Sequence, residues 1–399
     1  MISSHQRLWA DIQSILLEGL TAFLNGDAQS RLGRVLYPWS DSQIRNYWTV
    51  WFQRLSSASS RLDDQTPIPK AAVLSNTDQI AAILSGAYTW MLERHPNEDR
   101  QNRPPQETTC LKLFEEATYL GGDPFLIPVG KLWQYACEHL TENVAGLYLH
   151  GSLSTLDYVP GSSDLDALLV INNSTLSSPG RLLAARHHAI QSLRWFYRID
   201  FSQHHGYFVL TEFDLDHFDD ALFPSILFAI STNLLGPNVV RLRRRSILED
   251  RTLPFRKMVT RIESVSKGSE SLNGWFELKL FLQGVLLLPS LYLQAVGSPT
   301  YKRDSFAPVQ TLVSSDAWQI IEKVTQLRAL GIQKSLILPW ADEQLTRLPS
   351  PWTASMIHRW FRNGIPATVF DVLGDNWVRQ SVALADSLSN RLQNPRFAQ

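Results

Sequence analysis

The sequence predicts an α+β protein in which a small mixed sheet lies between two helical regions. Apolar residues recur at helical spacing in the first and last parts of the chain, and three short apolar runs with turn-rich flanks lie between them. Because 399 residues exceed one ordinary domain, we expect three parts. These are a helical region over 1–125, an α/β core over 126–235 and a helical region over 236–399.

Composition and charge exclude several classes of protein. Apolar residues make up 44% of the chain and charged residues 19%, which is enough to bury a core and too little charge for wholesale disorder. The 37 basic and 38 acidic residues give a net charge of −1, whereas a non-specific polyanion binder is normally basic. The 2 cysteines exclude a disulfide framework and a cysteine-rich zinc site.

In the N-terminal region, helical spacing over residues 8–23 predicts a first helix. Two more helices are expected over Ser40–Leu55 and Ala71–Arg94. The stretch Ser56–Lys70 between them is rich in Ser, Asp and Pro and predicts a loop. The polar, proline-bearing stretch His95–Thr109 is the expected linker to the core.

In the core, Val129–Leu140 predicts a helix, and the apolar runs Val144–His150 and Leu165–Ile171 predict strands. A helix over Pro179–Tyr197 and a third strand over Tyr207–Leu210 follow. The order strand, loop, strand, helix, strand is typical of an α/β unit.

From about Ala221 onward the spacing is helical to the end of the chain. The most apolar stretch, Phe281–Val296, contains Gln283 and Pro289 and is shorter than the roughly 20 residues of a membrane span. We therefore expect a buried helix there and no membrane partner. No basic leader with an apolar run and a cleavage site opens the chain, so we expect no secretory signal and a cytoplasmic protein.

The chemistry is predicted by one segment, LHGSLSTLDYVPGSSDLDALLVI, from Leu149 to Ile171. Gly151 and Ser152 follow the first strand, while Asp164 and Asp166 open the second and point to the same side of it. Two carboxylates on one side repel each other unless a cation lies between them, and Mg²⁺ prefers such oxygen ligands. The glycine lets a ligand approach the backbone, and the serine hydroxyl can hold phosphate oxygens.

This pattern indicates metal-assisted phosphoryl or nucleotidyl transfer. The chain lacks the Gly-Lys-Ser/Thr core of a P-loop and the His-Arg-Asp and Asp-Phe-Gly motifs of a protein kinase. An Asp-Leu-Asp sequence alone would more often be a solvated strand start, and the Gly-Ser element before it favours the functional interpretation.

The segment resembles the signature of the nucleotidyltransferase superfamily, which includes DNA polymerase beta, the CCA-adding enzymes and the aminoglycoside nucleotidyltransferases. The resemblance implies that the core has this fold, and that Gly151, Ser152 and Ser163 bind a nucleoside triphosphate, for which we expect ATP. It implies that Asp164 and Asp166 hold two Mg²⁺ ions and that a nucleoside monophosphate passes to an acceptor hydroxyl with release of pyrophosphate.

The family usually has a third carboxylate on a later strand, and here the sequence is ambiguous. Asp200 precedes the third strand and His205 lies at its start, and we rank these two equally as catalytic residues. Glu212, at the far end of the strand, ranks behind them. The alternative is that His204 and His205 only cap the strand.

A second, looser resemblance is carried by GSPTYKRDSF, from Gly297 to Phe306. In antibiotic nucleotidyltransferases a glycine turn and a lysine follow a long helix of the second domain. By this resemblance Lys302 would bind the triphosphate, as lysine does in many phosphate sites. The alternative is that Lys302 belongs to a solvated helix start.

The acceptor is left open by the sequence. A small molecule such as an aminoglycoside-like sugar is favoured over RNA or protein, which the long N-terminal region and the basic run Arg241–Arg245 would suit. That run is more often a solvated helix face. The competing hypothesis is a non-catalytic nucleotide-binding or regulatory protein of the same fold, such as a toxin–antitoxin-like component.

Overall fold

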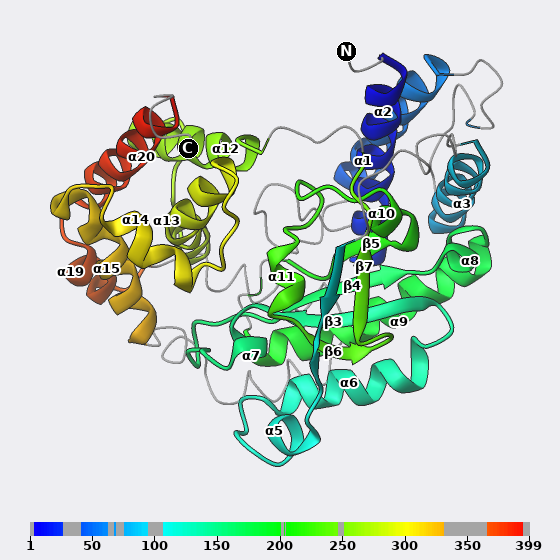
Figure 1. Cartoon of the computed structure of the whole chain (residues 1–399), viewed down its shortest axis with the longest axis horizontal. Coiled ribbons are helices and arrows are strands. Elements are labelled where there is room, and N and C mark those ends of the chain that lie inside the picture. The colour runs from blue at the N-terminus through cyan, green and yellow to red at the C-terminus, as the bar shows by residue number, and fades with distance from the viewer. Residues whose placement is uncertain are drawn as a thin grey trace.

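The computed structural model describes residues 4–26, 41–62, 68, 76–94, 107–200, 203, 205–245, 251–330 and 365–393. It confirms a protein of mixed helix and sheet with small mixed sheets. Figure 1 shows two halves, with the sheet and the N-terminal helices on the right and the C-terminal helices on the left.

Three helices open the chain, as expected: α1 (Ser4–Leu24), α2 (Asp41–Ser60) and α3 (Thr77–Arg94). Helix α2 continues into the stretch where we expected a loop, because Ala58 and Ser59 are still buried there. Residues 95–106 of the expected linker lie outside the part of the chain that the structure describes.

The main sheet has five strands in the order β2-β6-β3-β4-β5. Their bounds are β2 Lys112–Leu113, β3 Val144–His150, β4 Asp166–Ile171, β5 Phe208–Thr211 and β6 Thr232–Leu235. Strand β3 is antiparallel to β4 and β6, whereas β4 and β5 are parallel, as are β2 and β6. The three expected strands are confirmed, the third displaced by one residue.

A second sheet pairs β1 (Glu107–Cys110) with β7 (Val239–Leu242) in antiparallel register. Strand β1 lies mostly in the stretch that we expected to be a linker, whereas β2, β6 and β7 lie where we expected helical spacing. The expectation was wrong at these four short strands because each is stabilised by a partner far away in the sequence, and such pairing leaves little local pattern.

Seven helices of the described chain accompany the sheets. Their bounds are α5 Glu116–Leu120, α6 Ile127–His139, α7 Gly151–Thr155, α8 Asn173–Leu176, α9 Pro179–Ile199, α10 Glu212–Asp216 and α11 Ile226–Ala229. Helices α6 and α9 confirm the two helices expected in the core, and they pack against each other.

The regular elements described in the other half are all helices. Its elements are α12 Leu253–Ser266, α13 Trp275–Ala295, the 3₁₀ turn η1 Arg303–Ser305, α14 Phe306–Gln310, α15 Ser315–Ala329, α19 Ala367–Leu373 and α20 Trp377–Gln393. Helix α13 contains the one described stretch, Glu277–Ala295, long and apolar enough to cross a membrane, and 56% of it is buried inside the protein.

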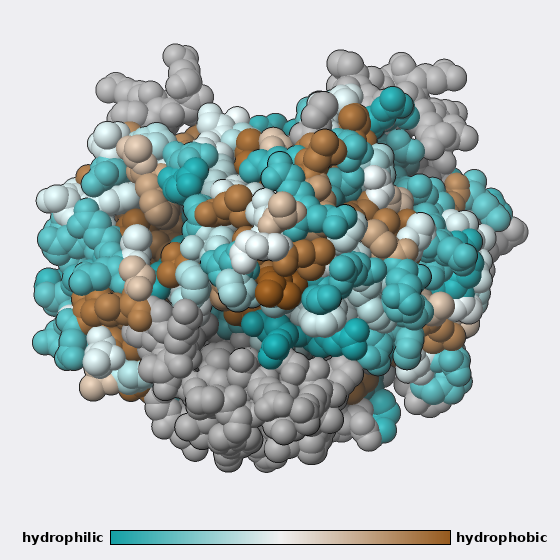
Figure 2. Space-filling view, turned by 90° about the horizontal axis from the view of Figure 1, so that it is seen from below, coloured by the Kyte–Doolittle hydropathy of each residue, from teal (hydrophilic) through white to brown (hydrophobic). Residues whose placement is uncertain are grey.

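Buried apolar side chains form two clusters. One runs from Leu8 to Leu242 and includes the N-terminal helices together with the main sheet. The other runs from Phe255 to Leu388 in the helical half. The N-terminal helices therefore share a core with the sheet, and the two halves meet through other contacts. On the face in Figure 2, hydrophobic residues form small groups among hydrophilic ones.

Candidate functional site

The site lies at one edge of the main sheet, where three strand ends meet. Strand β3 ends at His150 where β4 begins, because the two strands are antiparallel and His150 is opposite Asp166. Strand β5 begins at the same edge, because it is parallel to β4. The sheet thus brings the Gly-Ser element, the two aspartates and the start of the third strand together.

Gly151 is required at the end of β3. Its backbone φ is +68°, in the left-handed region that side chains rarely adopt. A Cβ atom at this position would lie 2.3 Å from Oδ2 of Asp166. The glycine therefore lets the carboxylate lie directly against the turn. Ser152 follows in the first turn of α7 and is half-buried.

The central cluster consists of Asp164, Asp166 and His205. His205 Nε2 lies 3.1 Å from Oδ1 of Asp166 and 3.6 Å from Oδ2 of Asp164. One ligand atom from each of the three lies within 4.8 Å of the others, the arrangement of a possible metal site. Burial alone would lower the pKa of His205, but hydrogen bonds to the two carboxylates outweigh it and raise the pKa to about 10.

His150 is a further imidazole beside this cluster. Its Nε2 atom is buried and has no hydrogen-bond partner among the described residues. Burial is the largest effect on its pKa and lowers it to about 4, so His150 is neutral at pH 7. This histidine, the last residue of β3, lines the cavity described next.

A cavity of about 410 Å³ opens onto the cluster. The sheet half contributes His150, Gly151, Ser152, Asp164, Asp166, His205, Phe208 and the segment around Leu222–Leu227. The helical half contributes Arg261, one face of α13, Pro299–Lys302 and Arg328. The cavity is therefore built jointly by both halves of the molecule.

Cations lie on the helical side of this cavity. Lys302 is half-buried there and forms no ion pair among the described residues. Burial and then Arg328 lower the pKa of Lys302, while the two aspartates act against them. The Nε atom of Arg328 is buried without a hydrogen-bond partner in the described chain. Arg261 donates to Glu270 at 2.9 Å.

Two of the predicted site residues lie elsewhere. Asp200 is 2% exposed, does not line the cavity and forms a buried ion pair with Lys279 of α13. Ser163 is buried, and its hydroxyl accepts a hydrogen bond from the backbone N–H of Val159, so it closes a turn. Neither side chain is available to a ligand in this cavity. Of the two equally ranked candidates, the structure places His205 beside the aspartates.

The remaining candidates are also located. Glu212 accepts a hydrogen bond from the backbone N–H of Asn173 at 2.7 Å, at the far end of β5. His204 lies outside the described residues. Ser152 and Lys302 both line the cavity. Sequence reasoning missed Arg261 and Arg328, which belong to no motif and reach the cavity only through the packing of their helices.

The basic run Arg241–Arg245 is not a helix face. Its first two residues belong to β7, and Arg244 forms ion pairs with Glu107 and Asp220. Arg245 is buried and pairs with Asp219 at 2.8 Å. The interpretation as a helix face was wrong because the run closes internal contacts between distant segments.

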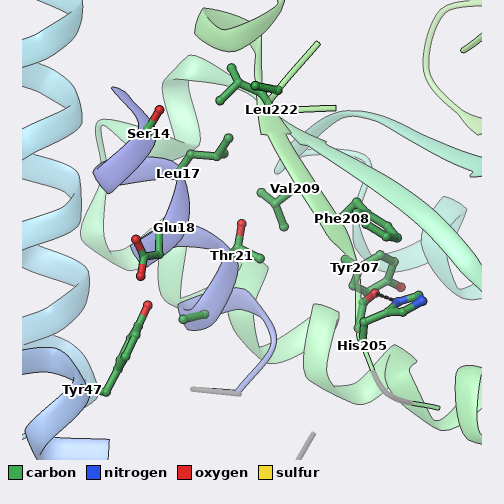
Figure 3. Close-up of a pocket in the computed structure, with 13 residues that line it drawn as sticks. Ser14, Leu17, Glu18, Thr21, Tyr47, His205, Tyr207, Phe208, Val209 and Leu222 are labelled. Carbon is green, nitrogen blue, oxygen red and sulfur yellow. Dashed lines mark hydrogen bonds between the residues drawn. The ribbon is translucent and has the colours of Figure 1, made fainter. Parts of the chain in front are cut away.

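A smaller cavity of about 210 Å³ lies between α1 and β5. Figure 3 shows Leu17 and Thr21 of α1 directed toward the strand, whereas the rings of His205 and Phe208 point to the other side. Both rings therefore belong to the larger cavity, although their residues border both.

Comparisons with known proteins assign no relative. The chain matches no protein-family model, no curated protein and no solved structure.

Proposed function

We propose that the protein is a Mg²⁺-dependent nucleotidyltransferase, with a core like that of the superfamily whose signature its sequence resembles. The observation that carries the proposal is the cluster of Asp164, Asp166 and His205 in the same cavity as Gly151–Ser152 and Lys302. Paired carboxylates beside a glycine turn, facing cations across a cavity, suit a metal–triphosphate complex.

Two of the three residues in the cluster, Asp164 and Asp166, suit Mg²⁺ as ligands. Carboxylate oxygens of Asp164 and Asp166 are the hard ligands that Mg²⁺ prefers, and they would hold it. An imidazole suits softer metals better, so His205 orients the carboxylates in this proposal. When bound, the metal stabilises charge on the attacking and leaving oxygens.

The chain's own residues divide the remaining work. Ser152 and the backbone of α7 bind phosphate oxygens, and Lys302 and Arg328 offset the charge of the leaving pyrophosphate. The acceptor hydroxyl attacks the α-phosphorus in line, its proton passes to solvent, and the bond from the α-phosphorus to the bridging oxygen breaks. ATP is the expected nucleotide, and a small molecule is the expected acceptor.

The test is pyrophosphate release from each of four nucleoside triphosphates with Mg²⁺ and a panel of sugars, aminoglycosides and RNA. We expect release that depends on one acceptor and falls at least about a thousandfold in the Asp164→Asn, Asp166→Asn double variant, about 4 kcal/mol of transition-state stabilisation. Asp371→Asn is the matched control, because Asp371 is exposed in α19 and does not line the cavity.

A second candidate is a non-catalytic nucleotide-binding protein. The observation that favours it is that His205 contacts both aspartates where the family usually has a third carboxylate. Such a protein would gain thermal stability from Mg²⁺ and nucleotide and release no pyrophosphate with any acceptor.

A further inference from the structure

One face of helix α13 lines the cavity. The lining residues recur every three or four positions, which places them on one side of the helix: Leu280, Gln283, Gly284, Leu287, Ser290, Leu291 and Gln294. The opposite side of α13 lies in the helical core. The apolar composition of this helix therefore serves two surfaces, one buried in the protein and one facing the cavity.

The sheet half presents a second apolar wall to the same cavity. Phe208 is 38% exposed and Leu287 is 41% exposed, although both are large apolar side chains. The Phe208 ring centroid lies 5.0 Å from that of His205, next to the aspartates. Large apolar side chains left open on two walls of one cavity are typical of a binding site for an apolar group.

The strand order indicates which reactant meets this wall. Strand β4, which carries Asp166, lies between β3 and β5. Gly151 and Ser152 follow β3, so the triphosphate belongs on that side in the proposed function. In-line transfer brings the acceptor from the side opposite the leaving pyrophosphate. That is the side of β5, to which Phe208 belongs, and the Phe208 ring centroid also lies 5.1 Å from that of His150 at the end of β3.

The charges of the cavity restrict the acceptor further. Of the described lining residues, Asp164 and Asp166 are the only acids, and in the proposed function the metal occupies both. The other charged lining groups are cations: Arg261, Lys302, Arg328 and the protonated His205. A polycationic acceptor would find repulsion here and no free carboxylate.

We propose that the gap between Phe208 and the cavity face of α13 binds the apolar body of the acceptor, which is an uncharged or anionic hydroxyl compound with an aromatic or aliphatic group. This rests on the proposed function and narrows its substrate class. It replaces the aminoglycoside-like sugar that the sequence suggested. Gln283, Ser290 and Gln294 supply neutral polar groups along the same face.

The experiment uses 1-anilinonaphthalene-8-sulfonate, an anionic aromatic probe, with the full-length protein and fluorescence as the readout. We expect saturable binding at one site, weakened at least about tenfold by Leu287→Asp and by Phe208→Asp. Leu113→Asp and Phe370→Asp are matched controls, since both side chains are exposed and neither lines the cavity. Thermal unfolding checks that each variant is folded.

Competition then separates the possible occupants. We expect the probe to stay bound when Mg²⁺–ATP saturates the protein, and tobramycin not to displace it. Displacement by Mg²⁺–ATP would assign the apolar walls to the nucleobase, and displacement by tobramycin would return the acceptor to the polycations. Equal loss of binding in the controls, or no saturable binding, would also overturn the proposal.

Failure of the proposed function has a different signature. The Asp164→Asn, Asp166→Asn variant removes the metal ligands and leaves both apolar walls intact. If the protein is no nucleotidyltransferase, Mg²⁺–ATP fails to bind or to release pyrophosphate, while the probe still distinguishes Leu287→Asp from Leu113→Asp.

Discussion

The two halves of the molecule present opposite charges to the same cavity. The sheet half contributes Asp166 at the start of β4, where it pairs with His150 of β3, and Asp164 two residues before it. The helical half contributes Lys302 and Arg328, which lie on a 3₁₀ turn boundary and in α15. The acids thus lie at one end of the sheet, and the cations come from the packing of separate helices.

A second pair of opposite charges from the two halves is in direct contact, with no cavity between the two side chains. Asp200, at the end of α9, contacts Lys279 of α13 directly, and both are buried. The comparison teaches that the same residue types serve two purposes here. Where charges of the two halves touch they join the halves, and where a cavity separates them a ligand can lie between them.

The largest expected effect comes from breaking the direct contact. Lys279→Ala leaves the Asp200 carboxylate buried without this partner, so we expect a loss of about 3 kcal/mol in the free energy of unfolding, measured in urea. The exposed pair of Lys267 and Glu263 gives the control, because Lys267→Ala should cost less than about 1 kcal/mol. Equal costs would mean that the buried pair does not join the halves.

The next largest effect is expected from displacing the carboxylate of Asp166. Gly151→Ala adds a Cβ atom 2.3 Å from Asp166 Oδ2 in a left-handed conformation, which displaces the carboxylate. We expect nucleotidyl transfer to fall about a hundredfold, or about 2.7 kcal/mol. Gly180→Ala is the matched change, since nothing lies within 4 Å of a Cβ there. Unaltered transfer in Gly151→Ala would remove Asp166 from the reaction.

A smaller effect is expected from removing the positive charge of Lys302. Lys302→Ala should weaken Mg²⁺–ATP binding about tenfold, or about 1.4 kcal/mol, because one cation leaves the cavity. Calorimetric titration measures the dissociation constant, with Lys267→Ala as the control on the surface. If both variants bind Mg²⁺–ATP equally well, Lys302 belongs to a solvated turn, and only the arginines supply positive charge to the cavity.

The smallest effect lies away from the cavity. Burial raises the pKa of Asp220, but hydrogen bonds from Ser225 and Arg244 lower it more, so the pKa of the folded carboxyl lies below its ordinary value. The ionised Asp220 carboxylate therefore stabilises the folded state. This stabilisation is present above the pKa of about 3.9 in the unfolded chain and is lost as the pH falls through the lower pKa of the folded state.

Arg244→Gln should therefore cost less than about 1 kcal/mol at pH 7, and less still near pH 3. Urea unfolding at both pH values measures the difference. A cost that grows on acidification would contradict this assignment, because protonated Asp220 no longer depends on the charge of the guanidinium.

The central elements of the fold were predictable from the sequence because they carry a strong local pattern. The runs Val144–His150 and Leu165–Ile171 are apolar, short and bounded by turns, and they form β3 and β4. The Gly-Ser element and the Asp-Leu-Asp pair could be expected at one sheet edge for the same reason. Strand β1 has no such pattern, because its pairing partner lies in β7.

The sequence does not decide whether Asp200 or His205 lies beside Asp164 and Asp166. Asp200 and His205 both lie just before β5, separated by four residues, and the sequence allows either to reach the aspartates. The choice depends on Lys279, which belongs to the other half and binds Asp200 away from the cavity. A partner 79 positions away leaves no local signal.

The sequence by itself determined the α+β class, the sheet edge on which Gly151, Asp164 and Asp166 meet, and the interpretation of the most apolar stretch as a helix packed inside the protein. These follow from period and spacing, which are local properties of the chain. Only the tertiary structure decided that His205 joins the aspartates, that Arg328 lines the same cavity and that one side of α13 lines it too. Each of these depends on two distant segments being packed together, and a contact of that kind is a property of the folded chain alone.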